Sequence, residues 1–176
     1  MPEIAEEALR AGRVAHVAFA VDGQPYIIPM TYHYEDGVIY LHGAPASRTL
    51  KSLRAGMPVA IEVLLLDGLI ASRDAESHSA NYRSVVVYGV AQRVTGMAEK
   101  RAILERMTRR YFPGRAVGQD YAAATEKQMR ALEVLRVPID ELSAKQRDGG
   151  PRGPRDDAPT PDGHTAFVLQ VGGRPM

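Results

Sequence analysis

The sequence predicts a compact domain made mainly of antiparallel β-strands with only short helices. Short runs of β-branched and apolar residues follow one another along most of the chain and are separated by turn residues. The pair Asp-Gly, a strong short-range hairpin signal, occurs between such runs at residues 22–23, 36–37 and 67–68. Six or seven strands connected in this way indicate an antiparallel β-barrel or β-sandwich.

The expected strands form a first meander and a later group. The first two Asp-Gly turns join the meander, and the third is expected to separate two strands of the later group. The strand at residues 82–95 should be the longest, and the strand at 135–139 should be the final core strand. In chain order, the expected strands cover residues 14–21, 24–34, 38–42, 59–66, 69–72, 82–95 and 135–139.

Four helices are expected, all of them short. Apolar residues recur at helical spacing in residues 2–11 and 99–111. Residues 46–55 predict another helix, which a glycine directly after it would end. Thr125 followed by Gln128 has the pattern of a capping box and predicts the start of the fourth helix.

The composition divides the chain into three parts. Residues 1–147 hold all the expected strands named above and form the barrel domain. Residues 148–164 are rich in Pro, Gly, Asp and Arg, a composition that buries little apolar surface, so we expect a flexible arm there. Residues 165–176 contain a last apolar patch, which we expect to dock on a partner subunit.

The bulk composition excludes several function classes. With 22 basic and 21 acidic residues the net charge is +1, which gives no electrostatic footprint for nucleic acid or for an anionic membrane. The absence of cysteine excludes disulfides, thiolate metal sites and cysteine nucleophiles, and the histidine spacing does not suggest a metal site. No apolar run is long enough to span a bilayer, and the acidic N-terminus does not have the pattern of a signal peptide, so we expect a cytoplasmic protein.

A strand, a tight turn and a helix start follow one another between His42 and Lys51. Backbone N–H groups at a helix start favour an anion, and Ser47 can add a hydroxyl donor. Arg48 and Lys51 are three residues apart, so both can reach the same side of the helix and bind a phosphate. The alternative is a capping serine with two solvated cations, and the pattern alone supports the two interpretations evenly.

Arg83 and Ser84 open the strand expected at residues 82–95. An arginine at the start of an apolar strand is often held near a fixed anion, although pairing with a nearby acid is the simpler explanation. The chain has neither a Gly-x-Gly-x-x-Gly nor a Walker-type loop, so a nucleotide would bind without a doubly wound fold.

Three segments of the chain resemble the flavin-nucleotide-binding group related to pyridoxamine 5′-phosphate oxidase. The segments are residues 12–53, 63–89 and 135–150, and the string from Asn81 to Gly89 is the most specific part. The resemblance implies an antiparallel split β-barrel that binds FMN and works as a homodimer, with the flavin in clefts between the subunits.

The resemblance also implies which residues meet the cofactor. The second strand would lie along the isoalloxazine ring, His42 and Gly43 would sit at the ribityl and phosphate end, and the Ser47–Lys51 turn would hold the phosphate. Arg83 and Ser84 match an Arg-Gln pair near the flavin, and Tyr32 and His42 are polar groups that could lie near a substrate. The implied cofactor-binding set is Ile28, Pro29, Met30, Thr31, His42, Gly43, Ser47, Arg48, Lys51, Arg83 and Ser84.

The departures from the oxidase argue against pyridoxal phosphate synthesis. Ile27–Thr31 stand where the oxidase has a basic, leucine-rich motif, and the C-terminal Arg-Leu-x-Pro motif is absent. We therefore expect an FMN-dependent oxidoreductase acting on another small molecule. The alternatives are a non-catalytic module that binds flavin, deazaflavin or haem, and an interaction protein with an empty barrel.

Overall fold

The computed structural model describes residues 1–157, 163 and 165–171. Strands hold 44% of the described residues and helices 23%, and the sheet is antiparallel, so the predicted fold class, a mainly β split barrel with short helices, is confirmed. The described helices include none that is both long and apolar enough to cross a membrane.

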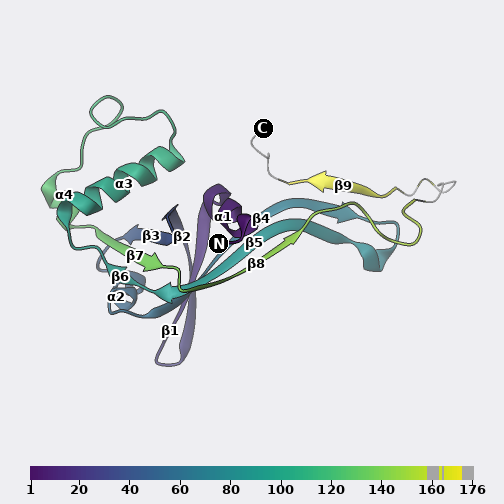
Figure 1. Cartoon of the computed structure of the whole chain (residues 1–176), viewed down its shortest axis with the longest axis horizontal. Coiled ribbons are helices and arrows are strands. Elements are labelled where there is room, and N and C mark those ends of the chain that lie inside the picture. Colours follow the sequence, from purple (N-terminus) through teal and green to yellow (C-terminus); the bar gives the residue numbers. More distant parts are fainter. Residues whose placement is uncertain (158–162, 164, 172–176) are drawn as a thin grey trace. The chain divides into compact units, whose positions relative to one another are not determined.

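Nine strands are described, two more than the upper number expected. Hydrogen bonds join them in the order β6-β7-β3-β2-β1-β4-β5-β8, and β9 also pairs with β4 (Figure 1). The strands are β1 (Val14–Val21), β2 (Gln24–Glu35), β3 (Val38–Gly43), β4 (Pro58–Ala71), β5 (Ser79–Val90), β6 (Gln92–Arg93), β7 (Glu133–Pro138), β8 (Glu141–Arg147) and β9 (Phe167–Gln170).

The predicted helices are present at the predicted places. A capping box opens the fourth one, because Thr125 Oγ1 accepts a hydrogen bond from Gln128 N while the Gln128 side chain accepts one from Thr125 N. The helices are α1 (Glu3–Ala11), α2 (Arg48–Leu53), α3 (Met97–Tyr111) and α4 (Glu126–Arg130), with a 3₁₀ turn at Ala75–Ser77.

Contacts divide the chain into two compact units. The first comprises residues 1–11, 64–85 and the described residues from 143 onward, and the second comprises residues 12–63 and 86–142. Each unit is described by itself below.

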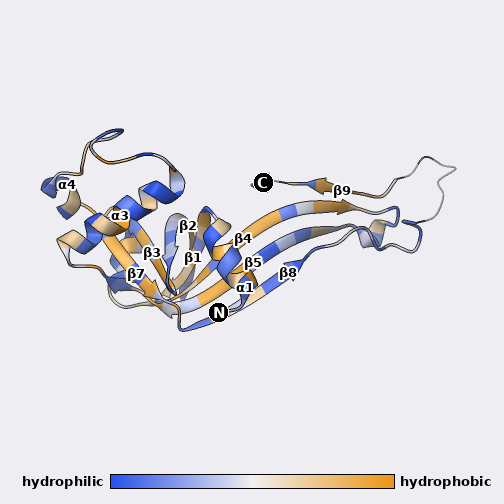
Figure 2. Cartoon of the chain, turned by 45° about the horizontal axis from the view of Figure 1, so that its top comes forward, coloured by the Kyte–Doolittle hydropathy of each residue, from blue (hydrophilic) through white to orange (hydrophobic). Residues whose placement is uncertain are grey.

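The second unit contains the strand meander and the helix α3. β1 and β2 form a hairpin from Val14↔Thr31 to Val21↔Gln24, and β3 pairs with both β2 and β7. Ile103 and Met107 of α3 pack with Val94 and Val134 in one buried cluster. Figure 2 shows the apolar character of β3 and β7, which this helix helps to cover. The packing of α3 therefore explains its helical spacing of apolar residues.

The first unit is organised around one buried arginine. Arg83 on β5 donates to both carboxylate oxygens of Asp67, at 2.9 and 2.6 Å, and also pairs with Glu7 of α1. The helix α1 contributes Ala5, Ala8 and Leu9 to the buried part of this unit. β9 pairs with the end of β4, from Gly68↔Gln170 to Ala71↔Phe167.

The third Asp-Gly pair does not form a turn, which corrects the sequence prediction. The first two pairs have the positive φ angles of a hairpin turn, at 50° and 80° for Asp22 and Gly23 and 49° and 77° for Asp36 and Gly37. Asp67 and Gly68 instead continue β4, because the Asp67 carboxylate binds Arg83 and Gly68 faces β9, where a Cβ would lie 3.1 Å from the Leu169 carbonyl oxygen.

A further expectation, about strand length, is wrong. The longest strand is β4, with 14 residues, whereas the segment predicted to be longest breaks into β5 and β6. The break falls at the buried Ala91, whose N–H donates to Met57 O at 3.2 Å. The strand near residue 135 is β7, and it is the last described strand with buried residues, because β8 and β9, which follow it, contain none.

The described part of the predicted flexible arm makes specific hydrogen bonds. Asp156 accepts from Ser72 Oγ, from Arg73 N at 2.8 Å and from Gly153 N at 2.6 Å, and these donors hold its pKa below the usual value. Residues 158–162 and 164 of the predicted arm, and 172–176 of the predicted docking patch, lie outside the described residues.

Candidate functional site

The turn from His42 to Lys51 connects the end of β3 to the start of α2. Ser47 N donates to Ala44 O at 3.0 Å, and Ser47 Oγ caps the helix by accepting from Leu50 N at 3.2 Å. Leu50 is buried, and a Cβ on Gly43 would lie 3.1 Å from its Cδ2 atom. The absence of a side chain at Gly43 and the buried leucine therefore fix the course of the turn.

Arg48 and Lys51 both project from this turn and are exposed. Within the part of the chain that the structure describes, neither forms an ion pair with an acid. The Arg48 guanidinium carbon lies 5.7 Å from the centroid of the Tyr26 ring, which orients this side chain along β2. Because α2 has only six residues, these side chains, rather than a helix dipole, would supply the attraction for an anion.

The four predicted ring-contacting residues of β2 lie on two faces of the strand. Ile28 and Met30 are half-buried and alternate with the exposed Pro29 and Thr31. Ile28 and Met30 face the same side of the sheet as the β1 residues opposite them, since Ile28 pairs with Val17. A flat ring that lies on one face of the sheet would therefore contact one pair directly.

His42 and Thr31 line a cavity of about 280 Å³. Its opposite wall comes from α3 and the residue after it, with the side chains of Leu104, Met107, Tyr111 and Phe112. Burial lowers the pKa of His42, so the ring is neutral at pH 7. Its Nδ1 atom is buried and has no hydrogen-bond partner among the described residues. The cavity is thus mostly apolar, with a neutral imidazole in one wall.

Sequence reasoning did not identify the α3 wall of this cavity. Leu104, Met107 and Tyr111 are spaced three and four residues apart, which places them on one helical face. That spacing was available in the sequence, but it predicts a buried face equally well. Only the pairing of β2 with β3, which brings Thr31 and His42 toward the helix, shows that part of this face borders a cavity.

Tyr32 is fully buried and does not reach a surface. Its ring lies against the Arg110 guanidinium, with 4.8 Å between the guanidinium carbon and the ring centroid. Burial raises the pKa of Tyr32 to about 12, so the phenol stays protonated at neutral pH. Its expected position near a substrate stays a prediction.

Arg83 and Ser84 lie on β5 in the other unit. The Arg83 guanidinium binds the Asp67 carboxylate through two parallel hydrogen bonds and also pairs with Glu7, which raises its pKa. The simpler of the two sequence interpretations, an arginine that pairs with an acid, describes these contacts. A role of Arg83 and Ser84 toward a cofactor stays a prediction.

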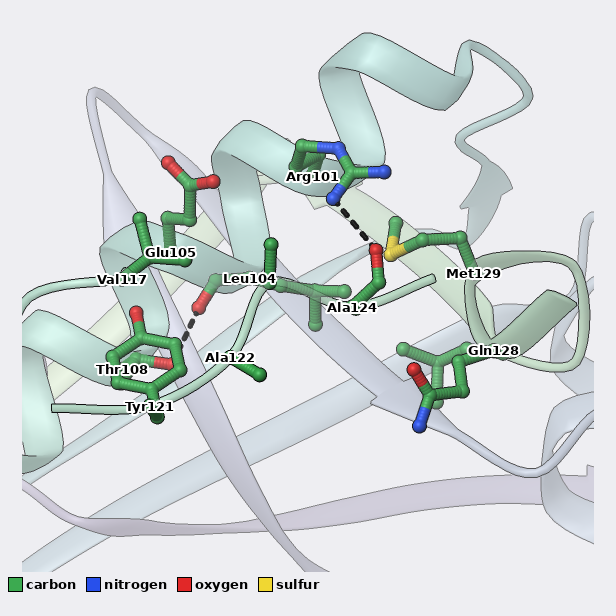
Figure 3. A pocket seen from close by; sticks show the side chains of 12 residues that line it. Arg101, Leu104, Glu105, Thr108, Val117, Tyr121, Ala122, Ala124, Gln128 and Met129 are labelled. Atoms are coloured by element: carbon green, nitrogen blue, oxygen red, sulfur yellow. Dashed lines mark hydrogen bonds between the residues drawn. The ribbon is translucent and has the colours of Figure 1, made fainter. Parts of the chain in front are cut away.

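A second cavity, of about 380 Å³, lies between α3, α4 and the segment that precedes α4 (Figure 3). Arg101 spans its edge by donating to Ala124 O at 2.8 Å. Its walls are mainly apolar, with Leu104 and Met129 among them. Leu104 also lines the His42 cavity, so the two spaces are neighbours on α3.

The whole chain is similar in structure to two proteins of known structure. The FAD and haem binding protein from Mycobacterium smegmatis is 29% identical, with a TM-score of 0.85, over 100% of this chain and 86% of that one. The flavocytochrome Anf3 from Azotobacter vinelandii is 28% identical, with a TM-score of 0.79, over 100% of this chain and 80% of that one.

The sequence comparisons give one family. No curated protein matches the sequence. The model of the family described as pyridoxamine 5′-phosphate oxidase matches residues 2–146. This range includes every strand of the meander, the helix α3 beside the His42 cavity and the helix α2 that follows the basic turn. This chain therefore belongs to the pyridoxamine 5′-phosphate oxidase family.

Proposed function

We propose that this protein binds a flavin nucleotide and uses it to oxidise or reduce a small molecule. The observation that carries the proposal is the similarity, over the full length of this chain, to two structures of 28–29% identity that are named for FAD and haem binding and as a flavocytochrome. Family membership supports it, as does the exposed basic turn beside the cavity at His42.

The residues on one side of the sheet fit the FMN part of such a nucleotide. Ser47, Arg48 and Lys51 would hold the phosphate, since both cations are exposed and neither is paired with a described acid. His42 and Gly43 would lie at the ribityl end, and β2 would run along the ring. From the resemblance, Arg83 and Ser84 would complete the site.

A bound flavin would supply the transfer of a hydride or of single electrons. The chain would orient it and keep water away from one part of the site through the apolar side chains of Leu104, Met107 and Phe112. Burial lowers the pKa of His42 and so keeps its ring neutral. The imidazole could therefore donate or accept a hydrogen bond without adding charge beside the cofactor.

The double variant Arg48→Ala/Lys51→Ala tests the proposed phosphate-binding site. The free energy of flavin binding should become less favourable by about 1.5–3 kcal/mol for each charge-assisted hydrogen bond that is lost. Titration of the apoprotein, followed by flavin fluorescence, measures the change. A matched control is Lys127→Ala/Arg130→Ala, which removes two exposed cations, also three residues apart, from the five-residue helix α4. Equal affinity of both variants for flavin would show that the phosphate binds elsewhere.

The redox activity is tested separately from binding. If the protein is an oxidoreductase that accepts electrons from a nicotinamide, anaerobic mixing of the loaded protein with NADH or NADPH should bleach the visible absorption of the oxidised flavin. A flavin that stays oxidised with both donors would favour a non-catalytic binding module or a different donor.

A second candidate function is haem binding, because one similar structure is named for FAD and haem binding and the other as a flavocytochrome. His42 has the chemistry for it, since a neutral imidazole in an apolar wall can ligate iron. Protein supplied with both haem and flavin during expression distinguishes the candidates. A Soret band that disappears in His42→Ala would support haem, and a flavin spectrum alone would exclude it from this site.

We also propose that the protein is a cytoplasmic homodimer with flavin at the subunit interface. This follows from the family resemblance and from the exposed apolar side chains described below. The mass in solution tests the assembly.

A further inference from the structure

A cavity of the second unit opens where β1 and β4 separate. The two strands pair only over His16–Ala18 and Ala60–Glu62, so their other ends diverge. The space between them is about 660 Å³, within the range of small-molecule sites. It is bordered by Phe19, Tyr26, Pro58, Tyr88, Asp140 and Glu141.

One wall of this cavity is a rigid aromatic platform. The rings of Phe19 and Tyr26 are stacked, with centroids 5.4 Å apart and planes inclined by 16°. Phe19 is 6% exposed and backs the half-buried Tyr26, so only the Tyr26 ring presents a face to a ligand. An aromatic ring held in this way is a good surface for stacking a nucleobase.

The platform is continuous with the basic turn. The Arg48 guanidinium carbon lies 5.7 Å from the Tyr26 ring centroid, so a phosphate bound by Arg48 would be placed directly beside the aromatic ring. Arg48 belongs to α2 and Tyr26 to β2, and the sequence alone did not indicate that the two side chains would be adjacent.

The opposite rim of the cavity is acidic. Asp140 and Glu141 follow one another at the start of β8, and the Asp140 N–H donates to Tyr88 O at 2.9 Å, which fixes the backbone there. No described cation pairs with either carboxylate. Carboxylates at this rim can accept hydrogen bonds from ribose hydroxyls, as acidic residues do in other nucleotide sites, and they would repel a further phosphate.

We infer that this cavity holds the adenosine half of FAD, with adenine stacked on Tyr26 and the ribose toward Asp140 and Glu141. The inference rests on the proposed function, since it takes the first flavin phosphate to lie on Arg48. The FMN expected from the sequence would then be the part of a larger nucleotide that binds the basic turn and β2.

The test compares FAD and FMN on the same apoprotein. The wild type should bind FAD about tenfold tighter than FMN, the effect expected for one stacked base. Tyr26→Leu should weaken FAD binding about tenfold more than it weakens FMN binding, because any effect through Arg48 is common to both nucleotides. Tyr121→Leu is the matched control, because Tyr121 lines the separate cavity beside α3, and it should change neither affinity.

Each outcome has one meaning. Equal affinities of the wild type for FAD and FMN, or equal losses of both in Tyr26→Leu, would overturn the adenosine site while leaving the flavin proposal intact. Failure of the wild type to bind either nucleotide would overturn both. Flavin released from the purified protein by denaturation gives an independent readout, and it should be mainly FAD.

Discussion

At Gly89 two strands of the sheet approach so closely that a side chain has no room. A Cβ at this position would clash with the carbonyl oxygen of Pro138 and would lie 3.0 Å from Val137 Cγ1. We expect Gly89→Ala to lower the free energy of unfolding by about 1–3 kcal/mol, the usual cost of overpacking a rigid site. Urea denaturation followed by circular dichroism measures it.

The control for this prediction is Gly150→Ala. A Cβ on Gly150 would meet no heavy atom within 4 Å, and Gly150 does not have a positive φ angle, so the change should have little effect on stability. If the two variants unfold at the same urea concentration, the approach of β5 to Pro138 is looser than the structure indicates.

Individual residues differed in how far the sequence could predict them. Arg48 and Lys51 lie three apart in one turn, and that local spacing was enough to anticipate two cations on one side. The partner of Arg83 could not be found in this way, because Asp67 is 16 residues away and was assigned to a turn. Long-range pairs of this kind depend on strand pairing, which local patterns do not encode.

At the scale of elements, the Tyr111 hydroxyl is one of the groups that attach the end of α3 to the sheet, beside the contact of Arg110 with the Tyr32 ring. The Tyr111 hydroxyl accepts a hydrogen bond from Tyr32 N at 3.0 Å and lies 2.8 Å from Tyr32 O and 2.7 Å from Arg13 O. We expect Tyr111→Phe to cost about 1–3 kcal/mol, because the hydrogen bonds between the Tyr111 hydroxyl and the Tyr32 backbone are lost in a partly buried position. The midpoint of chemical denaturation measures the loss.

Tyr121→Phe is the matched control for the attachment of α3. The Tyr121 hydroxyl has no hydrogen-bond partner among the residues that the structure describes, so its removal should leave the denaturation midpoint almost unchanged. A comparable loss in both variants would mean that the hydroxyl of Tyr111 does not stabilise the end of α3.

The Asp-Gly pairs show why local signals succeed in some elements and fail in others. At residues 22–23 and 36–37 nothing competes with the turn, and the backbone adopts the positive φ angles that the pair favours. At 67–68 the same pair has long-range partners on both sides, Arg83 and β9, and it continues a strand. Tertiary contacts therefore overrode a strong local preference there.

For the whole molecule, the strand content was predictable but the strand order was not. The alternation of apolar residues indicated an antiparallel β fold, and the hairpin turns gave the neighbours within the meander. The pairing of β7 with β3 joins residues nearly a hundred positions apart, and no local pattern marks it. The cavities at His42 and Tyr26 depend on such pairings, so the sequence indicated the basic turn but neither cavity.

The last prediction concerns assembly. Leu69 and Leu169 are cross-strand partners on β4 and β9, and they project from one face of this strand pair with Phe167 nearby. All three are exposed, at 43%, 54% and 52%, and exposed apolar clusters often mark protein interfaces. We expect a solution mass of twice 19.2 kDa by light scattering for the wild type, and the mass of a single chain for Leu69→Lys/Leu169→Lys.

The lysine substitutions separate dimer formation from folding, because side chains that are already exposed in one chain contribute little to its core. The double variant should therefore retain the circular dichroism spectrum of the wild type. Val117→Lys, which alters an exposed apolar residue beside α3, should leave the mass unchanged. A wild type with the mass of one chain would exclude the dimer, whereas a double variant that keeps twice that mass would place the interface elsewhere. Since the proposed flavin site lies between subunits, loss of the dimer should also weaken flavin binding, which links assembly to the basic turn.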